Sequence, residues 1–396
     1  MPPRADFLYP FPIEYRPVQG SRDHARRLFA CTEGVAAFRN LRIPGVRACA
    51  CANSFLDFSS YLRTMADKLE NQTLNPAYLG DDISLYRIEN GARVEAYIAS
   101  TPETRSICND PGVAGMNYTR KLSCACRKVL EQRPVELKEK ETVVVNILRG
   151  GLNYGLRDAL ADAYGWNSHT TCFISAQRAR NSADSEDWHI TENDYEKVYF
   201  PEVATLVIGD VVATGTSLRY ALQELLRSAL EQRVHLRSLL FFTFGGSKAA
   251  EILEDIDRQC RDLFPGYEKS VLIYFEGCFT CAQVDTPLSV RLTGTDLLRW
   301  HALMAPEFVA SQYEDPAYPL ERCTIYDAGS RAFWLRDYVQ DVIGYWRQNL
   351  QFAEHGMTFP QLLAERFPNL DISRFPADTD LKALSLRQLA KMEKML

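Results

Sequence analysis

Short apolar runs alternate with amphipathic stretches through the middle of this 396-residue chain. Runs rich in β-branched residues are typical of strands that are covered on both faces of a sheet. Apolar residues three and four positions apart, in the stretches between them, predict helices. The expected strands are 142–148, 171–176, 204–209, 236–243 and 271–275, and the expected helices are 152–163, 216–231 and 246–259. This alternation predicts an α/β fold with a doubly wound, mostly parallel five-stranded sheet.

The segments that flank this core follow other patterns. We expect a proline-rich arm (1–20) and a strand-rich stretch (80–115) before the core, with helices on both sides of it. The expected flanking helices are 22–31, 54–69, 116–133, 296–304, 331–352 and 379–395. We therefore divide the chain into an N-terminal arm and α+β region (1–135) that would form a hood, a core (136–285) and a C-terminal helical region (286–396).

The turn after the third expected strand has the strongest signal for chemistry, with the sequence Asp210-Val-Val-Ala-Thr-Gly-Thr-Ser217. A strand, a glycine-bearing turn and a helix start form a phosphate site, because backbone N–H groups and the helix dipole attract an anion. Asp210 stands at the strand's carboxyl end, where its carboxylate suits sugar hydroxyls or Mg²⁺. An ordinary crossover turn is the alternative. The expected phosphate-binding residues are Ala213, Thr214, Gly215, Thr216 and Ser217.

A second anion-binding turn is predicted at Arg149-Gly150-Gly151, after the first expected strand. Two glycines let backbone N–H groups approach an anion closely, and the guanidinium of Arg149 suits a pyrophosphate. Because this turn ends another strand of the same expected sheet, both turns should open at one edge. Two such turns suit a ligand with two separated phosphate groups.

These two motifs resemble loops of the type I phosphoribosyltransferases, and they occur in that family's chain order. The stretch 210–217 resembles the phosphoribosyl-pyrophosphate loop, and Arg149-Gly150-Gly151 resembles the pyrophosphate loop. The family usually carries an acidic residue at the place that Gly209 takes here, while Asp210 matches the second acidic place. The resemblance covers about residues 140–282.

The resemblance implies transfer of a phosphoribosyl group from phosphoribosyl pyrophosphate to a nucleobase or related heterocycle, with Mg²⁺ and release of pyrophosphate. It implies that residues 213–217 hold the 5′-phosphate and that Asp210 contacts the ribose and, through it or through water, Mg²⁺. Asp210 and Arg149 are then the candidate catalytic residues. The segment 181–203 takes the place of a loop that closes over the reaction centre. The expected pyrophosphate contacts are Arg149, Gly150, Gly151, Arg178 and Arg180; possible base contacts are 242–248 and 276–279.

Two other functions fit the same residues. Gly209 removes one acceptor, so the chain would equally suit a non-catalytic regulatory protein that binds phosphoribosyl pyrophosphate or a nucleotide; Gly209→Asp would then tighten binding. The third hypothesis is a cysteine–metal protein on a degenerate α/β core. Cys278 and Cys281 have a spacing that occurs in zinc sites, although buried structural thiols also explain most of the 11 cysteines.

Composition and charge limit the expected partners and cellular compartment of the protein. A net charge of −6 without a long basic run argues against a nucleic-acid partner. No apolar stretch has the length of a membrane span, and the first residues lack a secretory pattern. An odd number of cysteines along a long chain favours a reducing compartment. We therefore expect a cytoplasmic homodimer whose partners are phosphoribosyl pyrophosphate and a base or nucleotide.

Overall fold

A computed structural model describes most of the chain from residue 73 onward. The described residues are 73–148, 150–180, 188–192, 195–282, 286, 288–290, 297–321 and 328–396, without the side chains of 177–180, 188–192 and 328. They all belong to the unit Ser60–Leu396. The expected arm over 1–20 and the expected helices 22–31 and 54–69 lie outside them.

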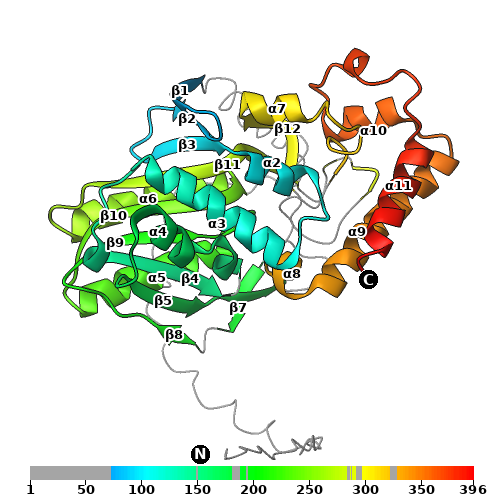
Figure 1. Cartoon of the computed structure of the whole chain (residues 1–396). Coiled ribbons are helices and arrows are strands. Elements are labelled where there is room, and N and C mark those ends of the chain that lie inside the picture. Colours follow the sequence, from blue (N-terminus) through cyan, green and yellow to red (C-terminus); the bar gives the residue numbers. More distant parts are fainter. Residues whose placement is uncertain are drawn as a thin grey trace, which may run out of the picture. The chain divides into compact units, whose positions relative to one another are not determined.

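Within the described residues, the centre of this unit is a ten-stranded mixed sheet (Figure 1). The order of the strands is β1-β2-β3-β11-β10-β9-β4-β5-β8. Strand β12 is not part of this order and pairs with β11. The strands are β1 (Thr73–Leu79), β2 (Ser84–Glu89), β3 (Glu95–Ser100), β4 (Thr142–Leu148), β5 (Thr170–Ser175), β8 (Glu196–Lys197), β9 (Val203–Gly209), β10 (His235–Gly246), β11 (Lys269–Cys281) and β12 (Leu297–Met304).

The five expected core strands are present as β4, β5, β9, β10 and β11, and they pair in parallel in the order β5-β4-β9-β10-β11. The expectation of a five-stranded sheet is nevertheless wrong. Strand β3 continues the parallel set beside β11, while β1, β2, β8 and β12 add antiparallel strands. The amphipathic alternation in β2 and β3 predicts strands, but it carries no information about the strands with which they pair.

Helices lie on both faces of the parallel strands. The chain moves from β4 to β5 in one direction and from β9 through β10 to β11 in the other. Because such crossovers are right-handed, α4 must lie on the opposite face from α5 and α6. Accordingly α4 packs with α3, and α5 packs with α6. These helices are α3 (Gly115–Glu131), α4 (Leu156–Tyr164), α5 (Thr216–Glu231) and α6 (Lys248–Leu263), and α2 (Pro102–Asn109) precedes them.

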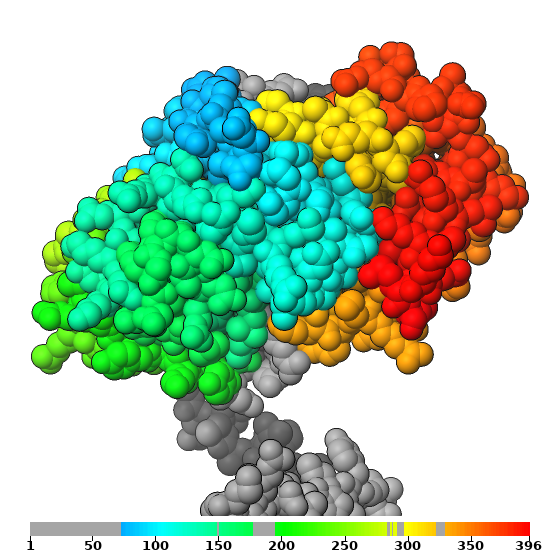
Figure 2. Space-filling model, viewed as in Figure 1, coloured from blue at the N-terminus to red at the C-terminus, as the bar shows by residue number. Residues whose placement is uncertain are grey.

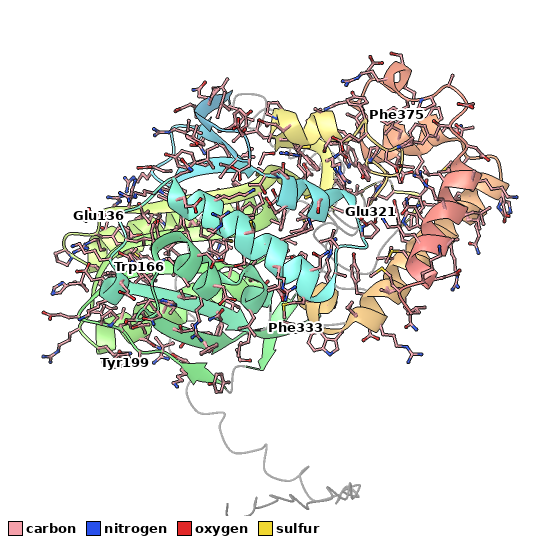
Figure 3. The ribbon with its side chains drawn as sticks, in the orientation of Figure 1. Glu136, Trp166, Tyr199, Glu321, Phe333 and Phe375 are labelled. Carbon is pink, nitrogen blue, oxygen red and sulfur yellow. The ribbon has the colours of Figure 1, made fainter. Side chains whose placement is uncertain are left out.

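The C-terminal residues form a second hydrophobic core around α9, α10 and α11. Trp346 is fully buried there and donates its indole N–H to Glu321, 3.1 Å away; Glu321 is labelled in Figure 3. Lys391 pairs with Asp110 at 2.7 Å, and Figure 2 shows the C-terminal helices beside α2 and α3. The helices are α7 (Pro306–Ser311), α8 (Ala328–Phe333), α9 (Leu335–Glu354), α10 (Phe359–Arg366) and α11 (Leu381–Glu393).

One expected helix, 296–304, is wrong, because residues 297–304 form strand β12. Its apolar run is short, and periodicity alone does not separate a short strand from a short helix. The expected helix 331–352 is divided at Trp334 between α8 and α9. Within the described part of the chain, no helix combines the length and the apolar character that a membrane span requires.

Candidate phosphate-binding site

The two predicted turns follow strands that are neighbours in the sheet. Strands β4 and β9 pair in parallel, and the chain leaves them toward opposite sides of the sheet. Such a point, where the strand order reverses, opens a crevice at the carboxyl ends of the strands, and ligands of open α/β sheets bind there. The turn at Gly150 and the turn at Asp210 both lie at this edge.

The two turns are also in direct contact. A Cβ atom placed on Gly150 would lie 3.0 Å from Asp210 Oδ1, and one placed on Gly151 would lie 3.0 Å from the carbonyl oxygen of Gly209. Glycine at both positions therefore permits the close approach of the two strand tips. The ligand roles of these residues stay predictions. Arg149, the first residue of the predicted pyrophosphate turn, lies outside the described residues.

Hydrogen bonds from the neighbouring strand β10 fix the turn after β9. The N–H of Asp210 donates to the carbonyl of Phe242 at 3.1 Å, and that of Val212 donates to the carbonyl of Phe244 at 3.0 Å. Gly215 then adopts a left-handed conformation, with φ of 78°, and no side chain caps α5 after it. The first turn of α5 also holds no acidic residue. Uncapped N–H groups of this kind attract an anion.

The hydroxyl groups of this turn differ in their surroundings. The Oγ1 atoms of Thr214 and Thr216 are 3.4 Å apart, and both residues are half-buried. The hydroxyl of Ser217 instead donates to the carbonyl of Ala176, 3.0 Å away at the end of β5. Ser217 would therefore contribute to a phosphate site through its backbone N–H rather than through the hydroxyl that the sequence suggested.

Tyr154 fills the space beside Gly209. At this position the type I phosphoribosyltransferases, which the chain resembles, usually carry an acidic side chain. A Cβ atom on Gly209 would lie 2.3 Å from Cγ of Tyr154. The tyrosine is fully buried, and its ring stacks on Phe275 with 6.5 Å between centroids. Its hydroxyl donates to the carbonyl of Asp210 at 2.8 Å and accepts from the N–H of Phe244 at 3.2 Å. We therefore no longer expect Gly209→Asp to tighten ligand binding; we expect it to weaken binding. The sequence analysis did not identify Tyr154 as part of the site.

A single carboxylate is compatible with Mg²⁺ only if the substrate supplies most of the other ligands. Within the described residues there is no group of three or more His, Cys, Asp or Glu side chains that is arranged to hold a metal. Mg²⁺ commonly takes one or two carboxylates and completes its shell with water and substrate phosphates. Asp210, beside the Gly150 turn, fits that role.

A hairpin leads into the expected closing loop 181–203. Strands β6 (Gln177–Arg180) and β7 (Trp188–Glu192) pair antiparallel, and both contact α5. Strand β7 and the two-residue strand β8 (Glu196–Lys197) lie within the expected closing loop 181–203, and its closure over the reaction centre stays a prediction. The residues 181–187 and 193–194 lie outside the described part of the chain. The backbone of Arg178 and Arg180 follows β5 at the same edge of the sheet, and their contact with pyrophosphate stays a prediction.

Glu276, a predicted base contact, faces into the protein instead. Its side chain is fully buried beside the first turn of α2, and its φ of 64° is unusual for a residue other than glycine. Its carboxylate accepts hydrogen bonds from the Ser100 hydroxyl at 2.7 Å, the Thr101 N–H at 3.1 Å and the Thr104 hydroxyl. Burial raises the pKa of Glu276 to about 7. We therefore assign it a structural role.

This raised pKa predicts a pH-dependent stability. Because the folded state binds the Glu276 proton more tightly than the unfolded state, the stabilisation is complete at low pH and is lost as the pH rises through about 7. The expected loss of unfolding free energy is about 3 kcal/mol between the ordinary pKa of 4.5 and the raised one. Glu276→Gln should flatten this part of the curve, measured by urea unfolding at a series of pH values. If the unfolding free energy of Glu276→Gln depends on pH as steeply as that of the wild type and of the exposed control Glu251→Gln, the assignment is contradicted.

The cysteine pair on β11 shows the features of packed thiols. Cys278 is buried, and burial raises its pKa to about 12, which disfavours the thiolate that binds metals. Cys281 is half-buried, and its sulfur lies 3.7 Å from the carbonyl oxygen of Ala282. The described residues thus offer no support for the cysteine–metal hypothesis.

Comparison with known proteins gives a partial structural likeness. No protein-family model and no curated protein sequence matches the chain. Among solved structures, it is similar to a hypoxanthine phosphoribosyltransferase from Staphylococcus aureus (14% identity, 43% of this chain and 73% of that one, TM-score 0.22). It is also similar to a hypoxanthine-guanine phosphoribosyltransferase from L. donovani (16% identity, 41% of this chain and 85% of that one, TM-score 0.24). Because these TM-scores are low, no functional property is transferred from these enzymes to the chain.

Proposed function

We propose that the protein binds phosphoribosyl pyrophosphate with Mg²⁺ and transfers its phosphoribosyl group to a nucleobase or related heterocycle, releasing pyrophosphate. The observation that supports this proposal is the contact between the two strand tips at the reversal of strand order. A Gly-Gly turn, the Asp210 carboxylate and the uncapped start of α5 lie together there. They match, in order, a pyrophosphate, the hydroxyls of a sugar and a 5′-phosphate.

In this reaction, the bond between C1 of the ribose and the pyrophosphate oxygen breaks while a ring nitrogen of the base bonds to C1. The proton of that nitrogen passes to water or to the departing pyrophosphate. The bonding electron pair leaves with the pyrophosphate, so positive charge develops on the ribose. Bound Mg²⁺ would neutralise charge on the departing pyrophosphate. The start of α5 and Thr214 would hold the 5′-phosphate, and Asp210 would orient the sugar and offset its developing charge.

One observation favours a second candidate, binding without turnover. Tyr154 excludes an acidic side chain from position 209, so of the two positions 209 and 210 only the second carries a carboxylate. A regulatory protein needs only affinity, whereas a transferase must also stabilise charge in the transition state. Cytoplasmic location and a homodimeric state stay predictions under both candidates.

Two measurements on the purified protein separate these functions: pyrophosphate release with a panel of bases, and calorimetric binding of phosphoribosyl pyrophosphate, both with Mg²⁺. Release with any base supports transfer, binding without release supports the second candidate, and absence of both overturns the proposal. Asp210→Asn should weaken binding or turnover about 10–100-fold, because a hydrogen bond to a charged group contributes about 1.5–3 kcal/mol. Asp262→Asn, an exposed change at the far end of α6, is the matched control and should have no effect.

A further inference from the structure

We infer that Tyr154 is a positioning residue, which holds Asp210 in the orientation that the sugar of the ligand requires. This inference rests on the proposed function. It specifies which residue holds the part of that site that would bind the sugar. Tyr154 would touch no substrate atom, because its side chain is fully buried and both hydrogen bonds of its hydroxyl go to the backbone.

The phenol joins three strand ends. Tyr154 is the last residue of the short 3₁₀ turn η3 (Gly150–Tyr154), which follows β4. Its hydroxyl donates to the carbonyl of Asp210, just after β9, and accepts from the N–H of Phe244 in β10. Burial raises the pKa of Tyr154 well above its ordinary value, so the hydroxyl keeps the proton that it donates. One side chain from the turn after β4 thereby holds the backbone at the end of β9 and near the end of β10.

The ring has a second consequence for the site. Because its Cγ occupies the position next to Gly209, no side chain from residue 209 can assist Asp210. Recognition of the sugar at the β9 tip then depends on the orientation of the Asp210 carboxylate, and that orientation depends on the backbone that Tyr154 holds. Small displacements of a positioned group reduce its contribution to binding strongly. Both hydrogen bonds of this hydroxyl go to the backbone of Asp210 and Phe244, so its loss should affect the pyrophosphate turn at Gly150 less.

A matched pair of substitutions separates positioning from general packing. Tyr338, in the C-terminal part of the chain, is also buried. Its hydroxyl donates to the carbonyl of Pro111 at 3.0 Å. Tyr154→Phe and Tyr338→Phe each remove one buried hydroxyl and keep the ring, so both should reduce stability, Tyr154→Phe more because its hydroxyl makes two hydrogen bonds. Only Tyr154→Phe should weaken the binding of ribose 5-phosphate, by about tenfold, while inorganic pyrophosphate with Mg²⁺ binds within about twofold of wild type.

The experiment measures both affinities by calorimetry for the full chain and adds the double variant with Asp210→Asn. If Tyr154 acts through Asp210, Tyr154→Phe should have little further effect on ribose 5-phosphate once Asp210 is replaced. Wild-type affinity in Tyr154→Phe, or an undiminished effect in the Asp210→Asn background, would overturn the inference while leaving the proposed function intact. If the wild-type protein binds neither phosphoribosyl pyrophosphate nor ribose 5-phosphate, both the inference and the proposed function are overturned.

Discussion

Gly209→Asp is expected to destabilise the protein strongly and to weaken ligand binding, although it places an acidic residue where phosphoribosyltransferases usually have one. Its Cβ would lie 2.3 Å from Cγ of Tyr154, an atom near the backbone that cannot move far. Overpacking of this kind costs about 1–3 kcal/mol, and an unpaired carboxylate buried beside the ring adds several more. We therefore expect the unfolding free energy to fall by about 4 kcal/mol or more, measured by denaturant unfolding.

Two further variants divide this effect into its parts. Gly209→Ala adds only the Cβ and should show the overpacking cost without the buried charge. The double variant Gly209→Asp with Tyr154→Ala gives the carboxylate room, so it should be more stable than the sum of the single changes predicts. If Gly209→Asp alone unfolds at the wild-type denaturant concentration, the packing of Tyr154 on Gly209 is not as described.

The core of the fold could be predicted because its signals are local. Parallel strands covered on both faces are nearly continuous apolar runs, and the expected strand 142–148 coincides with β4. The helix over 216–231 likewise coincides with α5, since its apolar face repeats over four turns. Pairing across the sheet depends on residues far apart in sequence, so the addition of β3 and β12 to β11 could not be predicted from their own residues.

The candidate site divides in the same way. Gly150, Gly151 and Gly215 stand out locally, because only glycine tolerates such close approach or positive φ. The role of Tyr154 is a contact with Gly209 from another strand end, and the expected helix 152–163 placed this tyrosine off the apolar face. One signal could have found it. A glycine in place of an acidic residue leaves a space, and an aromatic residue just after the Gly-Gly turn is close enough to fill it.

Glu276 shows a different limit. Glu276 follows the expected strand 271–275, and this place predicts the edge of the sheet, where polar residues often meet a ligand. Strand β11 instead continues to Cys281, so Glu276 lies within the strand. Its left-handed backbone directs the carboxylate to Thr101 and Thr104 at the start of α2, and a sequence pattern does not show this direction. The first turn of α2 and this part of β11 are joined by tertiary packing alone. Position along an expected strand therefore does not by itself predict which side chains face a ligand.

Gly215→Ala is expected to impair the phosphate turn through two separate effects. The residue has φ of 78°, which costs a residue with a Cβ about 1–2 kcal/mol. The new Cβ would also lie 2.3 Å from Cδ1 of Ile252 in α6, and relief of that clash costs about 1–3 kcal/mol. Because both effects displace the N–H groups at the start of α5, we expect ribose 5-phosphate to bind at least about tenfold more weakly, measured by calorimetry.

Ile252→Val removes the one atom that causes the clash, and so it separates the two effects. Alone, this change should cost about 0.5–1.5 kcal/mol and leave ligand binding unchanged. In the double variant with Gly215→Ala, part of the stability should return because the Cβ gains space, while binding should stay weak because the backbone strain persists. Full recovery of ribose 5-phosphate binding in the double variant would show that space, rather than the left-handed conformation of Gly215, governs the turn. Wild-type binding by Gly215→Ala alone would show that this turn is not the phosphate site.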